Sequence, residues 1–146
     1  MIALIQRVSQ AQVRVDEQLV GEIERGVLAL IGLQRGDSIA SAERLLERVL
    51  SYRVFPDAED RMNQSLRAVG GGLLLVPQFT LAADTHKGTR AGFSTAAEPG
   101  EAERLFASLV SCARRRYAPV SAGVFGAHMQ VALVNDGPVT FWLETR

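Results

Sequence analysis

The stretch VLALIGL, residues 27–33, is apolar on both of its faces. A run of this kind is typical of a strand that lies in the middle of a sheet and is covered on both sides. In a nearby run Val13 and Val15 alternate with polar residues, which is the two-residue period of a half-buried strand. Similar patterns predict a meander of strands ahead of residue 27, over residues 2–8, 11–16 and 19–24.

Two amphipathic helices are expected farther along the chain. Residues 39–53 place their apolar side chains on one stripe, and Pro56 prevents this helix from continuing. Residues 98–117 repeat the pattern, with Pro99 in the first turn. The remaining segments are expected to form strands over residues 73–76, 129–134 and 139–144, loops over residues 57–65 and 82–97, and a tight turn over residues 135–138.

These elements predict one domain, residues 1–146, of mixed α/β class, with a largely antiparallel β-sheet and the two main helices packed on it. A chain of 146 residues is long enough to bury a core without disulfides. Its composition, 47% hydrophobic and 22% charged residues, is that of a globular protein and argues against disorder.

Charge and composition exclude several functions. Sixteen basic residues balance sixteen acidic ones, so any anionic partner must be bound by a local patch. Cys112 is the only cysteine, which excludes an internal disulfide and a cysteine-based zinc cluster. Since only His86 and His128 remain as imidazole ligands, no metal and no cofactor are expected. The absence of a recognisable signal peptide or membrane span favours the cytoplasm and no membrane partner.

Two segments are not explained by folding alone. PQFTL, residues 77–81, puts an amide, an aromatic ring and a hydroxyl at the end of a buried strand, and NDGPVT, residues 135–140, forms the expected turn. No nucleophile-elbow pattern surrounds Ser94, so its nearness in sequence to His86 and Asp84 does not indicate a hydrolase triad. These patterns predict where a site lies and do not identify its substrate.

Basic side chains form two candidate phosphate contacts. His86, Lys87 and Arg90 lie in the expected loop that follows the PQFTL segment. The second group is Arg114, Arg115 and Arg116 in the last turn of the second helix. The latter arginines either complement the helix macrodipole or contact RNA, and both interpretations stay open.

The two segments resemble the signature motifs of the D-aminoacyl-tRNA deacylases. That family carries Ser-Gln-Phe-Thr-Leu at a strand end, and Gln78, Phe79 and Thr80 match its central residues. It also carries Asn-x-Gly-Pro-Val-Thr, which matches residues 135–140. Residues 1–8, 82–85 and 129–131 are similar to the family as well, so the resemblance covers essentially the whole chain.

The resemblance implies an aminoacyl-tRNA editing hydrolase that cleaves the ester of D-aminoacyl-tRNA and of glycyl-tRNA mischarged on alanine tRNA. Gln78, Phe79 and Thr80 are implied to be the catalytic segment, whose backbone N–H groups stabilise the oxyanion while the 2′-hydroxyl of the terminal adenosine assists. The family is homodimeric, with the sheets of two subunits associated. Gly137 and Pro138, joined by a cis peptide bond, are implied to reach into the partner's site and reject L side chains.

The resemblance also implies three supporting residues, Arg7, Pro77 and Asn135, and Arg7 is implied to help hold the Gly-Pro pair in place. In the basic loop, Lys87 and Arg90 are the expected tRNA contacts, and no DNA partner is expected. Pro77 stands where the family has serine, and a related, narrower branch of deacylases carries proline there. Two alternatives therefore stay open: a deacylase of mischarged L-alanyl-tRNA, and a non-catalytic RNA-binding dimer of the same fold.

Overall fold

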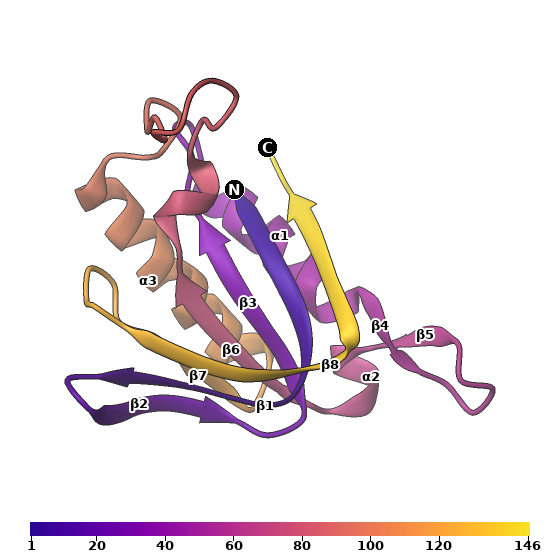
Figure 1. Cartoon of the computed structure of the whole chain (residues 1–146). Helices are drawn as coiled ribbons and strands as arrows, with labels where there is room; N and C mark the ends of the chain where they lie inside the picture. Colours follow the sequence, from indigo (N-terminus) through magenta and orange to yellow (C-terminus); the bar gives the residue numbers. More distant parts are fainter.

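Strand β3 (Gly26–Gly32) lies in the middle of the main sheet, and all of its residues except Leu30 are buried. In the computed structural model, which describes all 146 residues, it pairs antiparallel with β1 (Ile2–Val15) and parallel with β6 (Gly72–Pro77) (Figure 1). The strand order is β2-β1-β3-β6-β7, and β8 also pairs with β1. These outer strands are β2 (Gln18–Ile23), β7 (Val120–Ala122) and β8 (Gln130–Glu144).

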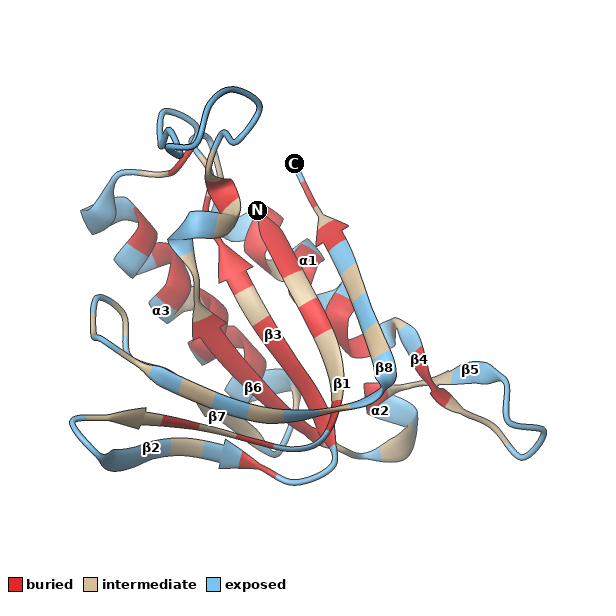
Figure 2. Cartoon of the chain, in the orientation of Figure 1, coloured by how far each residue is buried: buried red, intermediate tan, exposed pale blue.

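Helices α1 (Ile39–Ser51) and α3 (Pro99–Arg116) lie behind the sheet in Figure 1, and Figure 2 shows that their buried stripes face it. The predicted mixed α/β class with two main helices is therefore confirmed, and the sheet is mainly antiparallel, although β3–β6 and β6–β7 are parallel pairs. Ser38 caps α1, because its hydroxyl accepts from the Ser41 N–H and the Ser41 hydroxyl accepts in return. No helix of the chain has the length and apolar character needed to cross a membrane.

Apolar side chains fill both faces of the sheet. The larger cluster lies between the sheet and the helices, and includes Ile5, Val27 and Leu73. The smaller cluster lies on the opposite face, where the second half of β1 and the first half of β8 fold over the front of the sheet (Figure 1). This curvature leaves the upper part of the front face without any covering element.

Two expected breaks proved to be bends within continuous strands. β1 runs through Ser9 and Gln10, and β8 runs through residues 135–138, so the tight turn expected there is wrong. Both strands shift register at the same level, between Gln6 and Gln10 of β1. The two strands bend together and stay paired on both sides of the irregularity. This is possible because a bulge leaves extra residues unpaired without reversing the direction of the chain.

Smaller elements also depart from expectation. The first helix ends at Ser51 rather than at residue 53, because Arg53 begins β4 (Arg53–Pro56). The expected loop over residues 57–65 contains β5 (Met62–Ser65), which pairs with β4 in a hairpin that projects from the body (Figure 1). A short helix α2 (Leu66–Val69) follows it.

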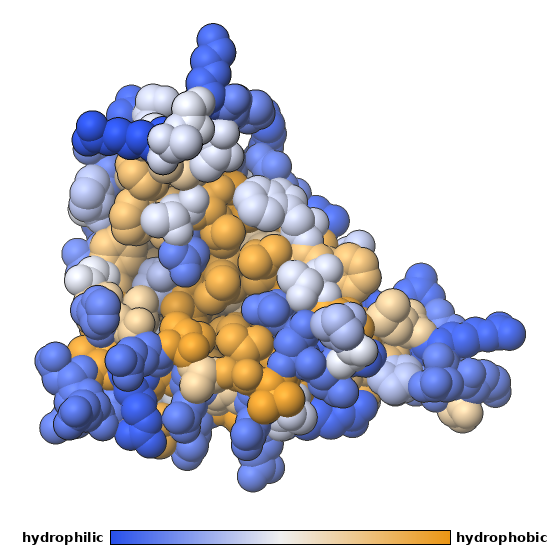
Figure 3. Space-filling model, viewed as in Figure 1, coloured by the Kyte–Doolittle hydropathy of each residue, from blue (hydrophilic) through white to orange (hydrophobic).

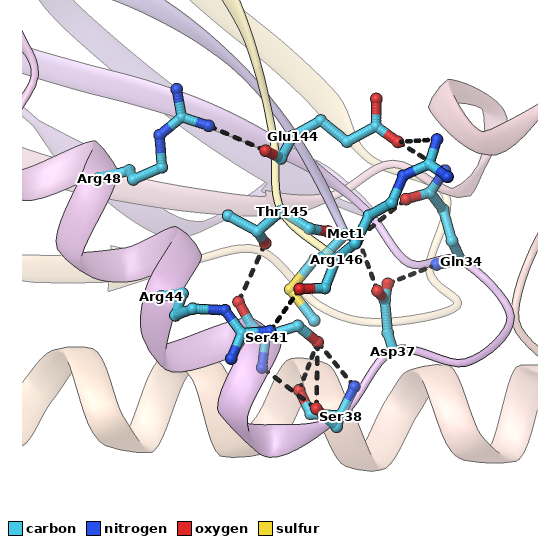
Figure 4. A network of polar contacts seen from close by, with 10 residues as sticks. All are labelled: Met1, Gln34, Asp37, Ser38, Ser41, Arg44, Arg48, Glu144, Thr145 and Arg146. Carbon is cyan, nitrogen blue, oxygen red and sulfur yellow. Dashed lines mark hydrogen bonds and ion pairs between the residues drawn. The ribbon is translucent and has the colours of Figure 1, made fainter.

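The α-amino group of Met1 is buried in a polar network near the start of α1 (Figure 4). It donates to Asp37 Oδ1 at 2.6 Å, to Gln34 Oε1 at 2.8 Å and to the Thr145 carbonyl at 2.7 Å. The Asp37 side chain is only 5% exposed, and its second oxygen accepts from the Gln34 N–H at 2.7 Å. One carboxylate thus ties β1 to the segment that leads into α1.

Replacing this carboxylate should destabilise the fold. We expect Asp37→Ala to lower the free energy of unfolding by about 3 kcal/mol, because it leaves a buried ammonium without its counter-charge. The exposed pair between Arg35 and Glu98 provides the control, and Glu98→Ala should cost less than about 1 kcal/mol. Urea denaturation of both variants measures the difference; equal losses would contradict the role given to Asp37.

Candidate active site

The PQFTL segment forms a short turn at the carboxyl end of β6. The Gln78 N–H donates to the Ile31 carbonyl at 2.7 Å, which extends the β3–β6 ladder by one bond. The 3-10 helix η1 (Phe79–Ala82) then packs beside β3. A Cβ atom on Gly32 would lie 2.8 Å from the Leu81 Cβ, so this glycine permits the close approach of η1.

This turn presents backbone donors rather than titratable groups. The N–H groups of Phe79 and Thr80 have no hydrogen-bond acceptor within the chain, whereas the Gln78 N–H, also expected to face an oxyanion, is engaged in the sheet. The Gln78 side-chain amide donates to the Thr80 hydroxyl. The Phe79 side chain is 57% exposed, and its ring centroid lies 5.1 Å from that of Phe93. The arrangement suits an uncharged ligand oxygen that acquires negative charge.

The NDGPVT segment bulges out of β8, because five steps of β8 oppose two steps of β1 between Gln6 and Val8. The Asn135 side-chain amide closes the neck of this bulge by donating to the carbonyls of Arg7 and Val139, each at 3.0 Å. Gly137 and Pro138 lie at the exposed tip, and the peptide bond between them is cis, as the resemblance implies.

The Arg7 side chain connects the bulge to β4. Its guanidinium donates to the Asp136 carbonyl at 2.9 Å and to the Val54 carbonyl of β4 at 2.8 Å. A Cβ atom on Gly137 would lie 2.6 Å from Val139 Cγ2, and the φ of +140° also favours glycine at this position. Arg7 and Asn135 therefore contact the bulge in the way expected of supporting residues.

The turn and the bulge do not meet within one chain. The bulge lies beside Arg7. Arg7 pairs with Val27 of β3, and Val27 pairs with Leu73 of β6, so the bulge is level with Leu73. The turn begins farther along β6, after Pro77. The four residues from Leu73 to Pro77 correspond to about 13 Å along β6. The three strand spacings from β8 across β1 and β3 to β6 correspond to about 14 Å. Gly137 and Pro138 are therefore roughly 20 Å from Gln78, far outside contact distance.

The loop after η1 carries the other expected contacts. Asp84 and Gly92 pair in an antiparallel bridge that closes it, and the Thr95 hydroxyl donates to the Ala82 carbonyl at its base. The backbone N–H and the ring of His86 bind the Asp84 carboxylate, which lowers the pKa of that carboxyl below its usual value. Lys87 and Arg90 are exposed and form no ion pair. They are free to contact a phosphate.

The uncovered face of the sheet is apolar, a feature that sequence reasoning missed. Trp142 is 51% exposed and lies opposite Leu4, with Leu30 half-buried on the same face. Figure 3 shows apolar side chains gathered over the middle of this face, where β1, β3 and β6 run in Figure 1. The alternation of apolar and polar residues in β8 was compatible with either face, so only the pairing with β1 reveals the exposed side.

A cavity of about 810 Å³ is separate from the turn. It is lined by Arg25 and the glycine run at residues 70–72, at the opposite end of β6 from Gln78. No group of three or more histidine, cysteine or acidic side chains is arranged to hold a metal ion.

The sequence of the whole chain matches one protein family. A sequence model described as D-Tyr-tRNA(Tyr) deacylase matches residues 4–144. The chain belongs to this deacylase family. A relative named D-aminoacyl-tRNA deacylase from Thioalkalivibrio sulfidiphilus is 67% identical over 144 residues, which cover 99% of this chain and 97% of the relative. One of the same name from Alkalilimnicola ehrlichii is 63% identical and covers 100% and 97% of the two chains.

Two solved structures place this deacylase family member among known folds. A protein titled "c-Myc DNA Unwinding Element Binding Protein" superposes with a TM-score of 0.95 at 35% identity, covering 100% of this chain and 99% of the other. A probable eukaryotic D-amino acid tRNA deacylase has a TM-score of 0.76 and covers 97% of each chain, and at 16% identity this likeness concerns the fold alone.

Proposed function

We propose that this chain is an editing hydrolase that cleaves the ester between a D-amino acid and the 3′ end of tRNA, and that it accepts glycyl-tRNA mischarged on alanine tRNA. The observation that carries the proposal is the exposed turn with the unbonded N–H groups of Phe79 and Thr80, in a chain of the deacylase family. Since aminoacyl-tRNA is made and used in the cytoplasm, the proposal places the reaction there.

The chemistry requires little of the side chains in the turn. Water attacks the ester carbonyl, and the two N–H groups of Phe79 and Thr80 stabilise the oxyanion that develops on it. When the oxyanion collapses, the bond to the 3′-oxygen of the adenosine breaks, and that oxygen leaves with the proton given up by the attacking water. The neighbouring 2′-hydroxyl of the adenosine is already held beside the ester, so positioning replaces a strong protein base. The Thr80 hydroxyl, which accepts from Gln78, positions water or substrate and is not a covalent nucleophile. No metal and no cofactor take part.

Selection against L-amino acids requires a second copy of the chain. The turn and the Gly137–Pro138 tip are too far apart to act together in one subunit, and the apolar face around Leu4, Leu30 and Trp142 lies uncovered between them. Exposed apolar surface of this kind favours association. In the homodimer, the tip of one subunit enters the site of the other, where it obstructs any L side chain.

Three other functions are possible for a chain of this fold. Pro77 favours the first, a deacylase restricted to mischarged L-alanyl-tRNA, because a related branch carries proline there. The second is a non-catalytic RNA-binding dimer. The third, binding of DNA, follows from the name of the 35% identical structure. A net charge of zero argues against duplex binding by this chain.

A panel of charged tRNAs tests the proposal. We expect purified protein to release D-tyrosine and glycine from tRNA, to leave L-tyrosyl-tRNA intact, and to keep its rate in EDTA. Release of alanine alone from L-alanyl-tRNA would assign the narrower activity. Binding of tRNA without release of any amino acid would establish the non-catalytic alternative, and retention of duplex DNA at physiological salt would establish the third.

The contribution of the tRNA hydroxyl can be separated from that of Thr80. We expect Thr80→Ala to lower kcat by about tenfold at most, because it removes a positioning hydroxyl. A substrate that ends in 2′-deoxyadenosine should lose several orders of magnitude with the unchanged enzyme. The reverse ranking, measured by single-turnover release of D-tyrosine, would make Thr80 a nucleophile.

Complementation tests the shared site. Thr80→Pro removes one oxyanion donor, and Gly137→Trp, or Pro138→Trp if the first does not fold, fills the partner's site. In a mixed dimer one site combines both defects, while the other has an intact turn and an intact tip. We expect each homodimer to be inactive and the purified mixed dimer to regain about half of the wild-type rate.

Differently tagged subunits allow the mixed dimer to be isolated, and gel filtration with circular dichroism shows that every form is folded and dimeric. An inactive mixed dimer made from such subunits would locate both elements of the site in one chain.

A further inference from the structure

A groove runs along α3 on the side of the molecule next to β7. We call it the α3 groove; it has a volume of about 640 Å³. One wall is a face of α3 from Glu103 to Arg115, and the other is formed by residues 122–125, which comprise the end of β7 and the segment after it. The turn, the bulge and the loop after η1 lie outside it, whereas Arg114 and Arg115 of the second candidate phosphate contact line it.

The groove is apolar along its length and basic at one end. Phe106 and Val110 form the floor, and the Phe125 ring lies 6.4 Å from that of Phe106. Val124, on the opposite wall, is 44% exposed. An apolar floor with an accessible aromatic ring can receive a nucleobase, because stacking accepts any base.

Arg114 and Arg115 supply the charge at the far end. Both are exposed, neither has a carboxylate within ion-pair distance, and Arg115 donates to the Ser111 hydroxyl at 2.9 Å. Arg116 follows directly but points away from the groove and pairs with Glu43 at 3.6 Å. The helix macrodipole acts on all three arginines alike. It therefore does not explain why only the two that line the groove are unpaired.

The groove begins beside the candidate catalytic turn. The Gly123 N–H donates to the Leu75 carbonyl at 2.8 Å, and a Cβ atom on Gly123 would lie 3.4 Å from the Pro77 ring. From Phe106, near this end, to Arg114 the helix rises about 12 Å. A short single-stranded segment that ends at the turn can span this distance along the groove.

We propose that the α3 groove binds the single-stranded nucleotides immediately upstream of the terminal adenosine of tRNA. Arg114 and Arg115 hold their phosphates, and the floor near Phe125 receives a base. The inference rests on the proposed function, since it assumes that the aminoacyl ester lies at the turn. Glu103, the only acidic residue of the groove, lies three helical turns from the arginines and leaves the phosphate end positive.

Two substrates and two matched variants test the groove. D-Tyrosyl-tRNA carries the upstream nucleotides, whereas D-tyrosyl-adenosine, esterified at its ribose, lacks them. Arg114→Ala/Arg115→Ala removes the groove pair. Arg104→Ala/Arg116→Ala removes the same charge from the same helix, at positions outside the groove, and serves as the control.

We expect the groove variant to lose about tenfold or more in kcat/KM on D-tyrosyl-tRNA, mainly through KM, and to match the wild type on D-tyrosyl-adenosine. The control should keep most of the wild-type rate on both substrates. The slope of log kcat/KM against log salt should decrease by about 1.4 for the groove variant, since each phosphate contact to a single strand contributes about 0.7.

Other results overturn the inference. Equal losses of kcat/KM in the two variants would indicate a general effect of charge. Equal losses on the two substrates would indicate damage to the turn. An unchanged kcat/KM in the groove variant would show that tRNA does not bind in the groove. Loss of the dimer in the groove variant alone, seen by gel filtration, would assign the groove to a second copy. If the wild type hydrolyses neither substrate, the proposed function itself is wrong. If the wild type is active and the groove variant is equally active, only the inference about the groove is wrong.

Discussion

The pairing of β8 with β1 on both sides of a bulge is the constraint on which the rest of the structure depends. Three surplus residues of β8 must leave the ladder without breaking it. Asn135 makes this possible, because its amide joins the Arg7 and Val139 carbonyls across the neck. The bend in both strands then folds their outer halves over the smaller core cluster. The exposed tip, the covered core and the open apolar face all follow from this one irregularity.

Local sequence patterns predicted most of the elements because those elements are stabilised by local or one-sided burial. The apolar run of β3 corresponds to a strand buried on both faces, and the stripes of α1 and α3 correspond to single buried faces; both patterns are visible within a few residues. The two wrongly expected breaks in β1 and β8 have one cause. A Ser-Gln pair or an Asn-Asp-Gly-Pro segment marks an interruption, but whether the chain reverses there depends on a partner strand more than a hundred residues away.

The candidate site likewise has some features that local sequence predicts and others that depend on distant strands. The PQFTL segment was recognisable because polar and aromatic residues at the end of a buried strand have no role in the core. Its best donors were not recognisable, since the Gln78 N–H becomes engaged only when β3 lies alongside β6. The contact of Arg7 with Val54 and the exposure of Trp142 likewise depend on which strands are neighbours. The resemblance to a family located Arg7, the turn and the Gly137–Pro138 pair, and the strand register showed how far apart the turn and the pair lie.

The donors that the turn leaves unbonded, the N–H groups of Phe79 and Thr80, belong to the main chain, and this determines how the segment can change without losing them. The side chain at residue 77 can change as long as the turn keeps its path, so Pro77 in place of the family's serine leaves these donors in position. Alanine scanning of these residues is insensitive to the same groups, because alanine retains its N–H. Amide-to-ester exchange at Phe79 or Thr80, by semisynthesis, removes the donor itself and leaves the side chain in place.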